Sequence, residues 1–113
     1  MKTFNFHIIT KDFDSDGEEK YLKDLVNVAV LSSADILQLR NKKIPARGLY
    51  RSALFIKKTL EGFVKNKKPA FIINDRPDIA YMAGADGVHI GQDDLPAASV
   101  KKLFPGLIIG DKF

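Results

Sequence analysis

The chain of 113 residues contains no cysteine, so neither a disulfide nor a thiolate metal site can contribute to its fold. No apolar run approaches the roughly 18 residues that a membrane-spanning helix needs. The first ten residues lack a basic region followed by a long apolar run, so we expect no signal peptide. Together these absences predict a cytoplasmic protein that does not enter a membrane.

The composition is that of an ordinary globular domain, with 45% hydrophobic and 28% charged residues. The net charge of +4 suits an anionic ligand as well as it suits nucleic acid. The densest group of lysines, Lys65, Lys67 and Lys68, carries no interleaved aromatic residues. We therefore expect small-molecule substrates and no nucleic-acid partner.

Short apolar runs alternate along the chain with longer segments of helical period, which is typical of βα units and a parallel sheet. The expected helices cover residues 18–32, 45–65, 77–83 and 96–104. The expected strands cover residues 4–9, 35–40, 70–74, 87–90 and 107–109.

This count of elements is compatible with two architectures. The repeat is near the roughly 30 residues of a βαβ unit. A closed (β/α)₈ barrel needs roughly 250 residues, so the chain would supply little more than half of one. A five-stranded flavodoxin-like sheet is the rival at this length, and spacing alone does not separate the two.

Three polar side chains lie at the end of the second expected strand and just beyond it, at intervals of two residues. In an extended chain Gln38, Arg40 and Lys42 leave on one face. They lie at the carboxyl end of the strand, where parallel α/β folds bind ligands. A guanidinium fork, an ammonium and a neutral amide suit an oxyanion such as phosphate. The alternative is a polar strand end with two cations whose stems cover apolar surface.

The next two strands also end in polar residues. Asn74 and Asp75 follow the third strand, and Asp93 and Asp94 follow the fourth. Since neighbouring parallel strands end at the same edge, Asp75 and Asp94 could share Mg²⁺, which is typically held by one or two carboxylates with water and phosphate oxygens. Either aspartate could instead cap the following helix. His89 is expected in the core rather than as a catalytic base.

Three segments resemble signatures of the thiamine phosphate synthase family. They are Gln38-Leu39-Arg40-Asn41-Lys42, Phe71-Ile72-Ile73-Asn74-Asp75, and residues 84–95, Gly-Ala-Asp-Gly-Val-His-Ile-Gly-Gln-Asp-Asp-Leu. The resemblance extends from about Phe6 to Gly110. It implies an α/β fold of the TIM (β/α)₈-barrel type, truncated after about the fifth strand, with residues 1–113 forming one partial barrel domain.

The resemblance also implies roles for these residues. The family couples 4-amino-2-methyl-5-hydroxymethylpyrimidine pyrophosphate to a thiazole phosphate, giving thiamine phosphate and pyrophosphate. By matched position, the groups that hold the pyrophosphate would be Gln38, Arg40, Lys42 and Asn74. Asp75 and Asp94 would hold Mg²⁺. The reaction is a dissociative substitution that needs charge stabilisation on the leaving group, here from Arg40 and Lys42, and no nucleophilic side chain.

The sequence departs from the family after the fifth strand. The family has a loop bearing serine and threonine there, whereas Gly110 is followed by Asp111-Lys112-Phe113, and the remaining strands are absent. An open barrel exposes strand edges and interior side chains. We therefore expect either a homo-oligomer or a separate C-terminal half.

Two alternative functions stay open at this point. One is a thiazole tautomerase-like isomerase on a similar fold, which does not need the metal carboxylates. Asp75 and Asp94 together argue against it. The other is a non-catalytic remnant or binding module.

Overall fold

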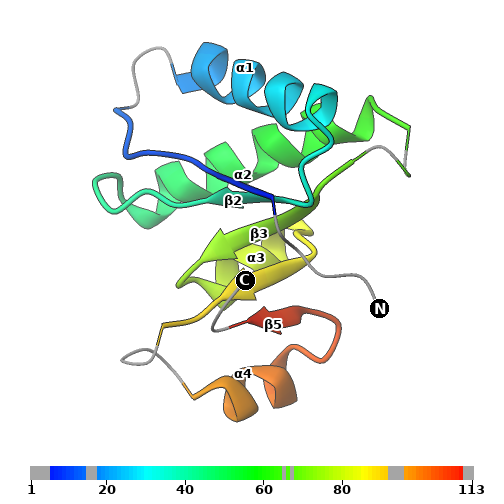
Figure 1. The fold of residues 1–113 in the computed structure, drawn as a ribbon. Coiled ribbons are helices and arrows are strands. Elements are labelled where there is room, and N and C mark those ends of the chain that lie inside the picture. The colour runs from blue at the N-terminus through cyan, green and yellow to red at the C-terminus, as the bar shows by residue number, and fades with distance from the viewer. Residues whose placement is uncertain (1–5, 15–17, 65, 67, 92–95, 111–113) are drawn as a thin grey trace.

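A computed structural model describes residues 6–14, 18–64, 66, 68–91 and 96–110. Strands and helices alternate from end to end, as the sequence predicts (Figure 1). No helix in these ranges is long and apolar enough to cross a membrane. The elements are β1 (His7–Ile9), α1 (Glu18–Leu31), β2 (Ile36–Leu39), α2 (Ala46–Glu61), β3 (Ala70–Asn74), α3 (Pro77–Ala83), β4 (Gly87–His89), α4 (Ala97–Leu103) and β5 (Ile108–Gly110).

The order of the strands decides between the two architectures. All five strands are parallel and lie side by side in the order in which they occur in the sequence, β1-β2-β3-β4-β5. A flavodoxin-like sheet has the order 2-1-3-4-5, because its chain reverses direction after the first unit. A sequential order is that of a TIM barrel. Within the described residues β1 and β5 are the two edges, so the sheet is an open piece of barrel wall.

The helices cover one face of this sheet. Leu37, Leu39, Phe71, Ile73 and Val88 pack with buried residues of all four helices into a single hydrophobic core. Because successive side chains of a strand point to opposite faces, the residues between them point to the other side. We call this side the inner face; it carries Ile9, Ile36, Gln38, Ile72, Asn74, Gly87, His89 and Ile108.

Two helices end in the same left-handed turn, once with glycine and once without it. Gly84 follows α3 with φ of +74°, and the next amide, that of Ala85, donates to the carbonyl of Ala80 at 2.9 Å. The sequence predicted this role for Gly84. Ser33 takes the corresponding place after α1 with φ of +59°.

Helix α2 ends at Glu61, four residues before the predicted end. Gly62 caps it by donating to the carbonyl of Thr59 at 3.2 Å. The apolar period continues to Phe63, which packs on the core from beyond the helix. The error in the predicted boundary arose because periodicity records burial and not helical hydrogen bonding.

Candidate functional site

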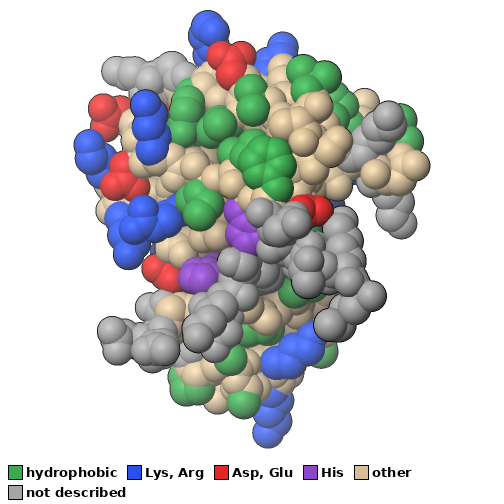
Figure 2. Space-filling model, in the orientation of Figure 1, with side chains coloured by type: hydrophobic (Ala, Val, Ile, Leu, Met, Phe, Trp, Pro, Cys, Tyr) green, Lys and Arg blue, Asp and Glu red, His purple; other side chains and the backbone are tan. Residues whose placement is uncertain are grey.

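The structure gathers five of the six candidate residues at the carboxyl ends of two neighbouring strands. Gln38 lies within β2, and Arg40 and Lys42 follow that strand. Asn74 is the last residue of β3, and Asp75 follows it. Strands β2 and β3 are paired in parallel, so both ends lie at one edge of the sheet. Charged side chains of both signs gather along the left side of the molecule in Figure 2, where these strands end in Figure 1.

An ion pair joins the two strand ends. The Nζ atom of Lys42 lies 3.9 Å from Oδ2 of Asp75, with the Lys42 side chain 59% exposed and the Asp75 side chain 30% exposed. Such an exposed pair contributes little to stability. The pair places a cation and a carboxylate side by side, and each is partly exposed.

Gln38 occupies a different environment from the two cations. Its side chain is on the inner face and the residue is only 4% exposed. In the sheet register it lies between Ile9 of β1 and Ile72 of β3. Arg40, two residues later, is exposed. The side chains at alternate positions thus change from a buried amide within β2 to exposed cations just beyond it. Together they would offer neutral and charged hydrogen-bond donors to an oxyanion.

Asp75 has an unusual backbone conformation. Its φ is +67°, in the left-handed region that residues other than glycine rarely adopt. Its amide donates to the carbonyl of His89 at 2.8 Å, which ties this residue to the end of β4. Strained backbone of this kind concentrates at functional sites. The conformation supports the assignment of Asp75 to a site rather than to a simple helix cap.

A short loop after β1 holds the β2 end in place. Thr10, Asp12 and Asn41 each hydrogen-bond the backbone across the gap between residues 10–13 and 40–43. These residues were not predicted from the sequence to take part in the site. Thr10 directly follows β1, so its position at a strand's carboxyl end was the available signal.

Arg76 lies next to Asp75 but is held by another partner. Its guanidinium donates to both carboxylate oxygens of Asp78, at 3.1 and 2.8 Å. This hydrogen bond from Arg76 lowers the pKa of Asp78 below its ordinary value, and the same bond raises the pKa of Arg76. The pair keeps Arg76 at the first turn of α3, so Arg40 and Lys42 are the better candidates for an anion.

Of the two predicted metal ligands, Asp75 lies within the described residues and Asp94 does not. Asp94 and its neighbour Asp93 lie outside the described residues, and within the described ranges no group of three or more histidine, aspartate or glutamate side chains could hold a metal. Asp75 alone supplies one partly exposed carboxylate, a hard oxygen donor of the kind that Mg²⁺ takes singly or in pairs. The donor present therefore fits Mg²⁺ with water and phosphate oxygens completing its shell.

His89 departs from its expected place in the core. It is half-buried on the inner face, in register with Asn74. The apolar neighbours Val88 and Ile90 pack on the helix side, and alternation turns His89 the other way. The pattern of an apolar strand concealed the fact that its histidine faces the end of β3.

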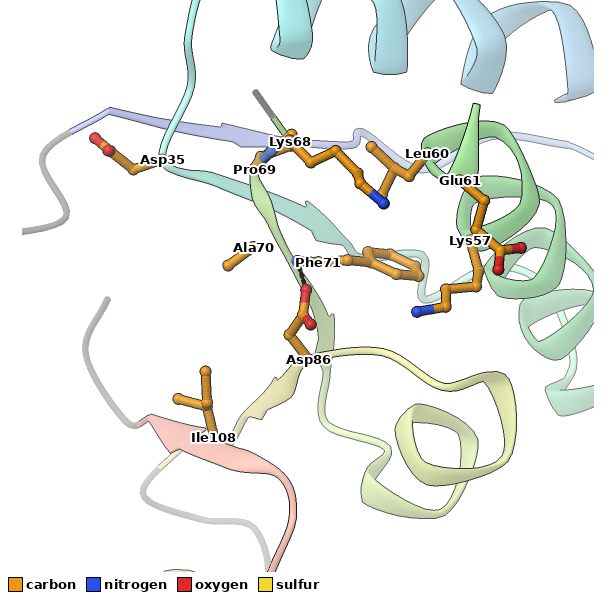
Figure 3. Close-up of a pocket in the computed structure, with 10 residues that line it drawn as sticks. All are labelled: Asp35, Lys57, Leu60, Glu61, Lys68, Pro69, Ala70, Phe71, Asp86 and Ile108. Carbon is orange, nitrogen blue, oxygen red and sulfur yellow. Dashed lines mark hydrogen bonds between the residues drawn. The ribbon is translucent and has the colours of Figure 1, made fainter. Parts of the chain in front are cut away.

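A cavity of about 510 Å³ lies at the opposite, amino end of the sheet (Figure 3). Its walls include Lys57, Lys68, Asp35, Glu61 and Asp86, so charges of both signs face it. Asp86 accepts a hydrogen bond from the amide of Phe71 at 2.7 Å, shown dashed in Figure 3. The amino end of a barrel generally serves stability and the carboxyl end serves chemistry. We therefore place the candidate site at the carboxyl ends and not in this cavity.

The comparisons with known proteins agree with the motifs. Residues 6–111 match the thiamine monophosphate synthase family. The chain belongs to this family. Thiamine-phosphate synthase from Methanoculleus marisnigri is 35% identical over 108 residues, covering 95% of this chain and 48% of the relative. The enzyme of the same name from Chlorobium luteolum is 48% identical over 88 residues, covering 77% of this chain and 40% of the relative.

A solved structure supports the same fold. Thiamine phosphate pyrophosphorylase from Pyrococcus furiosus superposes with a TM-score of 0.74 at 27% identity. The match covers 94% of this chain and 48% of that one. The chain therefore has the TIM-barrel type of α/β fold and spans about half the length of the relatives that it matches.

Proposed function

We propose that this chain forms the pyrophosphate-binding half of a thiamine phosphate synthase. The reaction would join the methylene carbon of 4-amino-2-methyl-5-hydroxymethylpyrimidine pyrophosphate to the nitrogen of a thiazole phosphate and release pyrophosphate. The observation that carries the proposal is the pairing of Lys42 with Asp75 across the ends of β2 and β3. It places a cation and a metal-type carboxylate at one point in a member of this family.

Each residue has a role that follows from its chemistry. Arg40 can grip two phosphate oxygens with one planar fork, and Lys42 adds a compact positive charge. The amides of Gln38 and Asn74 donate hydrogen bonds from the inner face. These groups stabilise negative charge on the pyrophosphate as its bond to the methylene carbon breaks, which is what a dissociative substitution requires.

Asp75, with Asp94, would hold Mg²⁺ at this place. When bound, the metal would neutralise charge on the pyrophosphate and act as a template for its oxygens. Asp75 has a left-handed backbone, and its carboxylate lies 3.9 Å from the ammonium of Lys42, which supports a metal site next to the proposed phosphate-binding cations. Because the pair is partly exposed, Asp75 could leave Lys42 to bind the metal, and Lys42 could then bind the pyrophosphate.

The thiazole phosphate would bind to a separate part of the enzyme. Ile9 and Ile108, on the inner face at opposite edges of the sheet, are 50% and 47% exposed. Such edges and apolar side chains favour association with further βα units. We propose that a C-terminal half, or a second copy of this chain, covers them in the cytoplasm, and that turnover requires it.

The first test is a calorimetric titration of the chain with pyrophosphate, with and without Mg²⁺. We expect saturable binding that requires the metal, and we expect Asp75→Asn to weaken it at least tenfold, because an amide is a poor ligand for a hard cation. The matched control is Asp24→Asn, which makes the same chemical change in the exposed pair of Lys20 and Asp24, 3.1 Å apart on α1. This control should bind as the parent does.

The outcomes separate the candidate functions. Binding that requires both Mg²⁺ and Asp75 supports the synthase half-site. Binding that ignores Mg²⁺ and survives Asp75→Asn would favour the tautomerase-like alternative. A folded chain that binds no pyrophosphate would contradict the proposal and leave a non-catalytic remnant.

A further inference from the structure

We propose that Thr10 is a positioning residue that aims Arg40 at the pyrophosphate, an inference that rests on the function proposed above. Thr10 directly follows β1 and is only 2% exposed. It is therefore too buried to bind a ligand itself. It acts through the strand beside it.

The hydroxyl of Thr10 makes two hydrogen bonds to one residue. Its Oγ1 atom donates to the carbonyl of Arg40 at 2.8 Å and accepts from the amide of Arg40 at 2.9 Å. The amide of Thr10 donates to the carbonyl of Gln38 at 3.0 Å. A hydroxyl can donate once and accept at the same time, so a single side chain satisfies both backbone groups of Arg40.

These bonds continue the sheet beyond its last regular residue. Strand β2 ends at Leu39, and without a partner the backbone of Arg40 would be free to rotate. Because the direction of the Cα–Cβ bond follows the backbone, fixing the amide and carbonyl of Arg40 sets the direction in which its side chain leaves the strand and narrows the region that its guanidinium reaches. A displacement of about 1 Å in such a group can cost a large factor in binding or rate.

Neighbouring contacts hold the rest of the segment in the same way. The amide of Lys42 donates to Oδ1 of Asp12 at 3.0 Å. Asn41, 8% exposed, donates through Nδ2 to the carbonyl of Phe13 at 2.8 Å. The loop after β1 thus holds the three consecutive residues 40–42 of the proposed oxyanion segment, and Thr10 is its most buried contact.

The test compares Thr10→Val with Thr10→Ser by calorimetric titration with Mg²⁺ and pyrophosphate. Valine keeps the branched shape but lacks the hydroxyl, so we expect about tenfold weaker binding. Serine keeps the hydroxyl and should bind within about twofold of the parent. Circular dichroism verifies that each variant is folded. If Thr10→Val does not fold, Asp12→Ala removes the exposed anchor of Lys42 and should weaken binding about threefold.

A double-mutant cycle with Arg40→Ala separates positioning from a general structural effect. If Thr10 acts through Arg40, adding Thr10→Val to Arg40→Ala should cost less than about twofold more. Full additivity would overturn the proposal, as would parent-like binding by Thr10→Val or equal losses in the valine and serine variants.

Amide hydrogen exchange gives an answer that does not depend on pyrophosphate. The amide of Arg40 should exchange about tenfold faster in Thr10→Val, since it loses its acceptor. If the parent chain binds no pyrophosphate, the proposed function fails, while faster exchange at Arg40 still supports the part of the inference that concerns Thr10. Unchanged exchange would overturn it.

Discussion

Aspartates at the two ends of the sheet make different contacts. At the amino end, the carboxylate of Asp86 accepts a hydrogen bond from the amide of Phe71 at 2.7 Å. The carboxylate of Asp35 likewise accepts a hydrogen bond from the amide of Phe6 at 3.2 Å. These carboxylates satisfy backbone donors where strands begin. At the carboxyl end, Asp75 adopts a left-handed backbone and its carboxylate lies 3.9 Å from the ammonium of Lys42. At the amino end the carboxylates stabilise the fold, and at the carboxyl end we propose that Asp75 and Lys42 bind a ligand.

This difference has a clear consequence for variants. Changes that disturb backbone contacts at the amino end should lower the free energy of unfolding and leave the pyrophosphate affinity of the folded chain intact. Changes at the carboxyl end should remove affinity and cost little stability. Variants at each end, measured for both stability and pyrophosphate affinity, test whether the two ends of the sheet differ in this way.

The largest effect is expected from Gly87→Ala at the start of β4. A Cβ atom on Gly87 would meet the carbonyl oxygen of Ile108, lie 2.8 Å from Cβ of Ile108 and lie 3.0 Å from Cδ1 of Ile72. Because a backbone atom must move, we expect a loss of about 2–3 kcal/mol in the free energy of unfolding. Urea unfolding followed by circular dichroism measures it.

Gly106→Ala is the matched control for this variant. A Cβ atom there meets nothing within 4 Å, so its effect should stay within about 0.5 kcal/mol. Equal stability of the two variants would show that β4 and β5 do not approach as closely as described.

A smaller loss is expected from Asp86→Ala. It leaves the amide of Phe71, at the amino end of β3, without its charged acceptor, which should cost about 1.5 kcal/mol. Asp86→Asn keeps an oxygen that can accept the same bond and should cost about half as much. Thermal unfolding of both variants gives the comparison. A loss of pyrophosphate affinity in folded Asp86→Ala would break the proposed division between the two ends.

Much of the fold could be predicted because it depends on local periodicity. Alternating apolar runs gave every strand and helix within a few residues, and Gly84 was assigned its left-handed turn correctly. The choice between a barrel and a flavodoxin-like sheet could not be made from spacing, since strand order is a property of pairing between distant segments. The family motifs supplied that choice by resemblance.

The site was predicted less completely because its supports are backbone contacts. Lys42 and Asp75 were assigned to the ends of neighbouring strands, but the partner predicted for Asp75 was Asp94, and the ion pair with Lys42 was not predicted. Nothing in the sequence indicated that one hydroxyl, that of Thr10, would satisfy both backbone groups of Arg40. The left-handed φ of Asp75 was equally hidden, because a positive φ at a residue other than glycine is uncommon and the identity of the residue does not reveal it.

A smaller change in stability than for Gly87→Ala or Asp86→Ala is expected from Asp75→Gly, and its sign is opposite to theirs. Relief of the left-handed conformation is worth about 1–2 kcal/mol, and the flexibility of glycine in the unfolded chain costs about 0.5–1 kcal/mol. The exposed pair with Lys42 adds little to the balance. We therefore expect the free energy of unfolding to rise by about 0.5–1 kcal/mol, while Mg²⁺-dependent pyrophosphate binding falls at least tenfold.

Ser33→Gly provides the control for that result, since Ser33 is the other described non-glycine residue with positive φ, at +59°. It should gain similar stability by the same relief of strain and leave pyrophosphate affinity unchanged, because it follows α1 at the amino end of β2. Urea unfolding and titration of the two variants distinguish the cases. If Asp75→Gly is less stable than the parent while Ser33→Gly is more stable, the carboxylate of Asp75 supports the fold as Asp86 does. The contrast between the two ends of the sheet would then fail at the residue on which the proposed site most depends.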